Sequence, residues 1–279
     1  MSGFSVKPLR SGSSGNLTLV EHAGTSILVD AGLASQRGLD AALAEAGVTW
    51  DDIDAVLVSH LHADHIHPSA VACCARHEVP LLLHEKNVRA FSRRVLSRSS
   101  MSGPLRTFGA EPLSVGAIEV LPFAVPHDAE GVTCGFLLSG RDGDDEARVA
   151  IATDLGSGGN GLYERFVASA LILIESNYDP AMLTKSPRHR VDRARVDSDV
   201  GHLSNEQAGK FLVRVMQESR KMPRAVVLCH LSADHNTPSL AVATVRGILS
   251  RYGFGAVPVH AARRDGPSPR FFANAARGR

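Results

Sequence analysis

Hydrophobic residues fall into short runs separated by turns, and the spacing within each run predicts a strand or a helix. The predicted strands comprise residues 5–9, 17–21, 25–30, 54–59, 81–83, 117–125, 132–139, 147–153, 171–174 and 224–229. The predicted helices comprise residues 35–46, 65–78, 85–96, 163–168, 205–218 and 239–251. Gly47 is a stop signal after the first helix, and Ser204 is an N-cap candidate for the fifth.

The order of these elements predicts the fold class. A run of strands comes first, strands then alternate with helices, and this order repeats after the midpoint. Such an order favours an α/β protein in which two packed sheets carry helices outside, a four-layer sandwich. No linker divides the chain, so we expect one domain over residues 1–279. The acidic segment 141–146 is expected to be a solvated hairpin connection, and the segment from Arg263 onward to be loosely ordered.

Composition adds little to the prediction of fold and function. The chain has 279 residues, 44% of them hydrophobic, without an apolar run of membrane-spanning length. The N-terminal segment lacks the apolar core of a signal peptide, so a cytoplasmic location and no membrane partner are expected. Four cysteines without a Cys-x-x-Cys pair are typical of buried thiols in a reducing compartment.

The net charge of +1 excludes a general polycation, so nucleic-acid binding would require local basic patches. Two segments qualify, residues 86–106 and residues 185–195, each rich in arginine. Within the first, Arg89 and Arg93 are four residues apart and share a helix face, and both are candidates for substrate binding. Either segment alone is more typical of a solvated basic surface, whereas both together beside a metal site are equally compatible with contact with a phosphate backbone.

The strongest chemical signal follows the apolar run 55–58, in the stretch Ser-His-Leu-His-Ala-Asp-His. Here His60 and His62 alternate with a leucine, so both can point to one side of an extended segment. Asp64 and His65 then turn the other way. Imidazole and carboxylate groups suit zinc and similar metals, so one short motif can serve two adjacent ions. A surface loop without function is the alternative interpretation, and compact clusters of four donors argue against it.

Three further donors follow apolar runs, where strand ends fix side-chain geometry. His127 follows residues 120–125, Asp154 follows residues 149–153, and His230 follows residues 226–229. Taken singly, Asp154 would be a turn or helix cap and His230 an edge histidine. The remaining histidines lack this context, although His67 and His235 lie close to the candidate donors in sequence.

Together these seven residues resemble the five-motif signature of the metallo-β-lactamase-fold hydrolases over nearly the whole chain. The resemblance implies the four-layer αβ/βα sandwich of that family. It also implies a first metal ion held by His60, His62 and His127. A second ion would be held by Asp64, His65 and His230, with Asp154 bridging the two.

Finer motifs are similar to the YycJ branch of the family, also called WalJ or VicX. They are Ser-Gly-Ser-Ser-Gly-Asn at 11–16, Asp-Ala-Gly-Leu at 30–33, Glu-Ser-Asn-Tyr-Asp at 175–179, Gly-His-Leu-Ser-Asn at 201–205 and His-Leu-Ser at 230–232. The branch is associated with 5′→3′ exonuclease activity on DNA. One departure is His235, where the branch commonly carries a second asparagine, and this bears on substrate contacts more than on metals.

The resemblance implies a hydroxide bridging two divalent ions that attacks phosphorus, with Asp64 orienting it or taking its proton. His202 is expected to protonate or stabilise the leaving oxygen, with Glu175 as its partner, as in the related tRNA 3′-processing ribonucleases. A buried structural contact is the alternative role for His202. Ser204 and Asn205, at a helix start, are expected to contact phosphate through backbone amides.

Other functions remain open from the sequence. A hydrolase of a thioester or lactone would use the same hydroxide without a polyanion groove, and the basic segments argue against it. A β-CASP ribonuclease would need a large insert between Asp154 and His230, which are only 76 positions apart (230 − 154). A non-catalytic regulator is disfavoured by the intact donor set. The sequence leaves open the metal (zinc, manganese or iron), RNA against DNA, end polarity and homo-oligomerisation.

Overall fold

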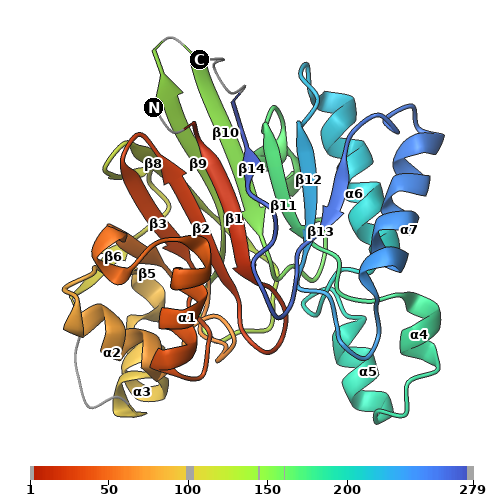
Figure 1. Ribbon diagram of the computed structural model, residues 1–279. Helices are drawn as coiled ribbons and strands as arrows, with labels where there is room; N and C mark the ends of the chain where they lie inside the picture. Colours follow the sequence, from red (N-terminus) through yellow and green to blue (C-terminus); the bar gives the residue numbers. More distant parts are fainter. Residues whose placement is uncertain (1–2, 99–103, 144, 160, 275–279) are drawn as a thin grey trace.

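The computed structural model describes residues 3–98, 104–143, 145–159 and 161–274, which form two seven-stranded sheets packed face to face (Figure 1). The first sheet has the order β14-β1-β2-β3-β4-β5-β6. Its strands are β1 (Ser5–Arg10), β2 (Leu17–His22), β3 (Thr25–Val29), β4 (Ala55–Leu57), β5 (Leu81–His84), β6 (Leu105–Phe108) and β14 (Phe271–Phe272). Strands β14 to β3 pair antiparallel and strands β3 to β6 pair parallel.

The second sheet repeats this plan in the order β13-β12-β11-β10-β9-β8-β7. Its strands are β7 (Leu113–Val115), β8 (Ile118–Val125), β9 (Thr133–Asp142), β10 (Asp145–Ala152), β11 (Leu171–Glu175), β12 (Ala225–Cys229) and β13 (Val259–Ala261). Strands β7 to β10 pair antiparallel and strands β10 to β13 pair parallel. The carboxyl ends of β8, β10, β11 and β12 therefore meet at one edge of the sheet.

Helices cover both outer faces of the paired sheets (Figure 1). Helices α1 (Gln36–Ala46), α2 (Pro68–Arg76) and α3 (Val88–Arg94) pack on the first sheet, and α6 (Asn205–Glu218) and α7 (Pro238–Arg251) pack on the second. Two short helices, α4 (Pro180–Thr184) and α5 (Arg190–Val196), lie between β11 and α6 along the chain. The expected four-layer α/β/β/α sandwich is confirmed.

Strand alternation explains why the layers form. Ile27 and Val29 of β3 point into the core between the sheets, whereas Leu28 points into the core beneath α1 to α3. Leu173 and Ile172 of β11 divide in the same way between the central core and the core beneath α6 and α7. Because side chains alternate across a strand, a fully apolar strand buries both faces and requires a layer on each side.

Helix caps match the sequence signals. Ser35 accepts a hydrogen bond from the amide of Gly38, and Gly47 ends α1 in the left-handed region at a φ of 81°. Ser204 and Gln207 form a capping box at the start of α6. The helix expected over 65–78 begins only at Pro68, because residues before it form the donor loop. The segment expected as a helix over 85–96 is a 3₁₀ turn followed by α3.

One expectation about loops is confirmed with narrower bounds, and another is wrong. The segment 141–146 does contain an exposed hairpin connection, but strands β9 and β10 extend into it, since Asp142 pairs with Asp145. The segment from Arg263 is ordered as far as residue 274: β14 pairs with β1, and Phe271 is buried. No helix in the described part of the chain is long and apolar enough to span a membrane.

Candidate metal centre

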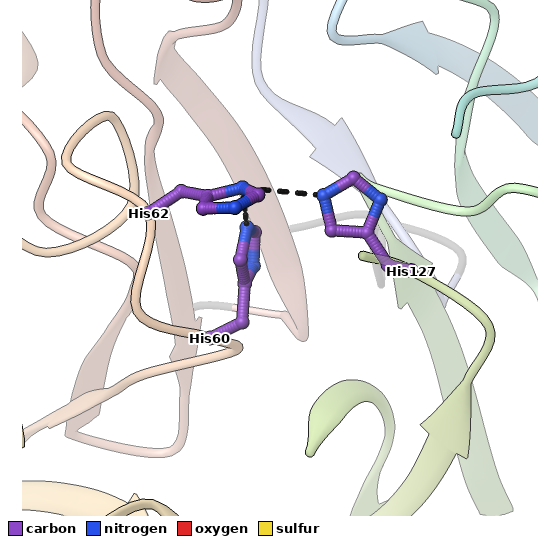
Figure 2. Close-up of side chains that lie close together, drawn as sticks. All are labelled: His60, His62 and His127. Atoms are coloured by element: carbon purple, nitrogen blue, oxygen red, sulfur yellow. Dashed lines mark hydrogen bonds between the residues drawn. The ribbon is translucent and has the colours of Figure 1, made fainter. Parts of the chain in front are cut away.

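Three imidazoles from two separate loops converge beyond the ends of β4 and β8. His60 and His62 lie in the loop after β4, and His127 lies in the loop after β8 (Figure 2). His62 Nδ1 is 3.0 Å from His60 Nε2 and 3.2 Å from His127 Nε2. Nitrogens that bind one tetrahedral zinc at about 2.0–2.1 Å lie about 3.3 Å apart, so the three are spaced as ligands of a single ion.

Burial keeps His60 and His62 neutral. His60 is completely buried, and burial lowers its pKa well below the usual value. Burial, with His127 beside it, lowers the pKa of His62 to about 4. Neutral imidazole is the form that binds a metal ion. The Nδ1 of His127 lies 2.9 Å from the carbonyl oxygen of Gly201, to which it must donate, so its Nε2 is left to accept.

A second group of donors adjoins the first. The Nε2 of His230 lies 3.3 Å from Oδ2 of Asp64, and the Nε2 of His65 lies 3.8 Å from the same oxygen. Ligand atoms of these three residues all lie within 4.8 Å of one another, and they include donors that are 166 positions apart in the sequence. This group therefore also has the compactness of a metal site.

Asp154, which follows β10, lies between the two groups. Its carboxylate oxygens are 2.5 Å from His65, 2.9 Å from His230 and 3.8 Å from both His60 and His127. Although burial opposes its charge, His230 and His65 hold the pKa of Asp154 well below its usual range. Both oxygens are buried and make no hydrogen bond of normal geometry with the described residues. Such an orphaned carboxylate, faced by imidazole nitrogens, fits residues that converge on cations.

Asp30 orients this centre, and the sequence analysis did not single it out as a site residue. Its carboxylate accepts hydrogen bonds from the amide and hydroxyl of Ser59, at 2.8 and 2.9 Å, and lies 2.7 Å from His65 Nδ1. A carboxylate on the far nitrogen fixes the ring and tautomer of a ligand histidine. The available signal was its place directly after β3, the same strand-end context that identified Asp154.

His230 is held in an unusual backbone conformation. Its φ is 53°, in the left-handed region that residues with a side chain rarely adopt. The side-chain amide of Asn177 donates to its carbonyl at 2.8 Å, and its own amide donates to Ser11 Oγ at 2.9 Å. Both backbone groups of His230 are therefore fixed by residues that carried no assigned role in the sequence analysis.

Glu175 and His202 form a contact beside the donors. Nδ1 of His202 lies 2.7 Å from Oε1 of Glu175, and the same oxygen lies 2.9 Å from Nδ1 of His230. The backbone amides of Leu155 and Leu203 donate to the other oxygen of this fully buried carboxylate. Burial opposes a charge on His202, but Glu175 and Asp154 outweigh it and raise its pKa to about 9.

The centre opens into a cavity of about 620 Å³. Its wall includes His62, Asp64, Asp154, His202 and His230, together with Arg188, Arg195, Arg264 and His235. Two of these arginines are paired with carboxylates, Arg188 with Asp234 and Arg195 with Asp128. His235 lies 2.7 Å from the hydroxyl of Ser186, which makes it part of the wall and not of the donor set.

The four residues that were expected to bind substrate do not line this cavity. The amide of Ser204 donates to Gln207 at 2.8 Å and that of Asn205 to the carbonyl of Tyr178 at 2.9 Å, and both residues are buried. Neither amide is available to a phosphate, which corrects that expectation. Arg89 and Arg93 lie on α3 and do not line the cavity, and Arg93 is paired with Glu130.

Comparisons with known proteins show the family of the chain. A profile of the metallo-beta-lactamase superfamily matches residues 10–172. The chain is 30% identical over 254 residues to exodeoxyribonuclease YycJ of Bacillus anthracis, covering 91% of this chain and 92% of that protein. It is 31% identical over 261 residues to exodeoxyribonuclease WalJ of Streptococcus pneumoniae serotype 2 (strain D39 / NCTC 7466), covering 91% of each.

Solved structures share the fold at low sequence identity. The metallo-beta-lactamase fold protein YhfI of Bacillus subtilis superposes with a TM-score of 0.66 at 16% identity, covering 96% of this chain and 100% of that one. The short form of human tRNase Z superposes with a TM-score of 0.62 at 16% identity, covering 95% and 98%. At such identities, the likeness establishes the architecture alone.

Proposed function

The chain belongs to the metallo-beta-lactamase superfamily, in its YycJ-like branch, and we propose that it is a metal-dependent phosphodiesterase that degrades DNA in the 5′→3′ direction. One observation carries the proposal: a compact histidine and aspartate centre opens into a cavity whose wall bears three arginines. The centre suits hydrolysis, and the arginines suit a phosphate-bearing substrate. The names of the YycJ and WalJ relatives support DNA as that substrate.

The donors fall into two sets, which we assign to two divalent ions, zinc or manganese, with iron as a further candidate. His60, His62 and His127 would hold the first, and Asp64, His65 and His230 the second, with Asp154 shared. When bound, such ions supply an activated water at neutral pH and offset the charge of a phosphodiester. Asp30 and Gly201 would fix the rings of His65 and His127 through their outer nitrogens.

His202 is the proposed proton donor to the leaving oxygen. It lines the cavity, and its Nδ1 is held 2.7 Å from Glu175. A buried carboxylate at one nitrogen orients the ring and favours its protonated form, so the other nitrogen can deliver a proton. The proposed role of Asp64, which also lines the cavity, is to orient the attacking water or accept its proton.

The cavity wall would neutralise substrate phosphates. Arg264 donates to the carbonyl oxygen of Leu231 at 2.8 Å and has no carboxylate partner among the described residues, so its charge remains available to an anion. Arg188 and Arg195 would present charge that is partly offset by their paired carboxylates. We propose that residues 1–279 work as one domain, because both sheets contribute to the central core and β14 returns to β1.

The decisive experiment is digestion of duplex DNA labelled at either the 5′ or the 3′ end by metal-free enzyme to which each metal has been restored. Immediate release of the 5′ label as mononucleotide, with slow loss of the 3′ label, is the expected result. A thioester and a lactone serve as comparison substrates. Turnover of these compounds without any DNA degradation would instead identify a small-molecule hydrolase.

A further inference from the structure

The cavity at the metal centre continues along the C-terminal part of the chain. Ser232 and Arg264 line both this cavity and a second one of about 380 Å³. Pro238 and Arg263 line both the second cavity and a third one of about 540 Å³. The third cavity lies against α7 and β13, which are adjacent in Figure 1, and reaches Arg246. Because they share wall residues, the three cavities are neighbours and form a row that leads away from the site, called the path below.

Three arginines mark this path. Arg264 begins it, Arg263 stands at the junction of the second and third cavities, and Arg246 lies farther along α7. None has a carboxylate partner among the described residues: Arg264 and Arg263 donate to backbone carbonyls, and Arg246 is exposed. Of the residues that the structure describes, Asp265 is the one carboxylate in the walls of the second and third cavities. The path therefore carries a net positive charge that protein groups do not neutralise.

The fold holds this path in place. The loop between β13 and β14 is tied down by a hydrogen bond from the amide of Ser268 to Pro8 and by another from the amide of Arg263 to the Ser268 hydroxyl. Gly12 leaves room for Arg264, since a Cβ at Gly12 would lie 3.3 Å from its Nη1. The guanidinium that joins the first two cavities is thus positioned by elements from both ends of the chain.

We propose that this path, from Arg264 past Arg263 to Arg246, binds the sugar–phosphate backbone of a single DNA strand whose end lies in the metal centre. This inference rests on the proposed function and adds the route of the substrate strand. Apolar residues such as Val242 and Pro269 line the third cavity together with Arg246 and Arg263, which suits the sugars and base faces of an unpaired strand. A positively charged groove with such surfaces is the usual design for binding single strands.

The test measures how tightly the full-length, metal-loaded protein binds phosphorothioate oligothymidylates, which resist cleavage. One probe has about 12 nucleotides and the other has two, a contrast set by the usual footprint of a single-strand groove. The double variant R246E/R263E should weaken binding of the long probe about tenfold at low salt and lower its salt slope by about 1.4. Binding of the dinucleotide, which occupies only the first cavity, should stay nearly unchanged.

Arg220→Glu is the charge-reversal control. Arg220 is exposed and follows the carboxyl end of α6, whereas Ser204 caps the other end of this helix. Long-probe affinity that is equal in R246E/R263E, in R220E and in the wild-type protein would overturn the path. If R246E/R263E lost as much affinity for a blunt duplex as for the long probe, the single-strand assignment would be overturned. Failure of the proposed function would appear separately, as wild-type protein that binds the long probe but degrades no end-labelled DNA.

Discussion

His202 and Glu175 come from different segments and meet with 2.7 Å between Nδ1 and Oε1, at the wall of the cavity beside the donors. Glu175 is fully buried and also accepts hydrogen bonds from two backbone amides, so it has little freedom to move. A histidine fixed in this way can present its remaining nitrogen to a substrate in a constant direction. The same pair also lies near Asp154 and His230, so a ligand role is the competing interpretation.

Replacement of His202 by alanine separates these roles. We expect His202→Ala to retain both metal ions but to lose about 10²- to 10⁴-fold in kcat on a DNA end, the usual contribution of an acid–base group. Metal content by elemental analysis and single-turnover cleavage are the two measurements. Loss of one metal ion in this variant would show that His202 is a ligand.

Asp30→Asn tests the orientation of His65. Asparagine tolerates the left-handed backbone of Asp30, whose φ is 62°, so the fold should be maintained. The neutral amide no longer supports the outer nitrogen of His65, and metal affinity should fall about 10- to 100-fold. Titration with a competing chelator measures this. Asp54→Asn is the control, because the Asp54 carboxylate accepts a hydrogen bond from the amide of Ser26 at an exposed position; equal affinities in both variants would contradict the role of Asp30.

Removal of divalent ions should destabilise the protein, because His60, His65, Asp154 and His230 are buried together and the Asp154 carboxylate makes no hydrogen bond of normal geometry with the described residues. At a free metal concentration about 100 times the Kd, binding stabilises the folded state by about 2.7 kcal/mol. Chelation should therefore lower Tm by about 5–10 °C for a chain of this length. Differential scanning calorimetry before and after metal is restored checks the effect, and a Tm indifferent to metal would argue against any bound ion.

Charge reversal of Arg89 and Arg93 on α3 should weaken DNA binding and flatten its dependence on salt. Glu130 already contacts both Arg93 and Arg94, so the effect should be smaller than that of R246E/R263E. Fluorescence anisotropy with duplex and single-stranded probes over a range of salt concentrations measures it. If affinity and salt slope are both unchanged, α3 lies outside the DNA-binding surface.

The four cysteines should be inert in the folded protein. All are buried, and burial raises the pKa of Cys73 to about 11 and those of Cys74, Cys134 and Cys229 to about 12. The thiolate is the reactive form, so a raised pKa and restricted access both suppress reaction at pH 8. A chromogenic thiol reagent should react with little of the cysteine in native protein and with all four cysteines after denaturation. Rapid native labelling at any of the four would contradict this.

Much of the fold was predictable because its central strands are apolar on both faces. Strands such as β11 and β12 bury every residue, and that continuous pattern is legible in the sequence. The short strands β6, β7, β13 and β14 were missed, because three or four partly exposed residues, or two in β14, carry too little pattern. Pairing with a neighbouring strand, and not local sequence, makes them strands.

By itself, the sequence determined the strand-end donors, since His127, Asp154 and His230 each close an apolar run that fixes where the next side chain can point. Only the tertiary structure decided their surroundings. Ser11 contacts His230 across 219 positions, and Arg264 lines the cavity from a segment that was expected to be loosely ordered. Such contacts depend on how the two sheets and the C-terminal strand pack together. Hydrogen bonds between distant segments produce no periodic pattern of hydrophobic and polar residues, so the sequence does not reveal them.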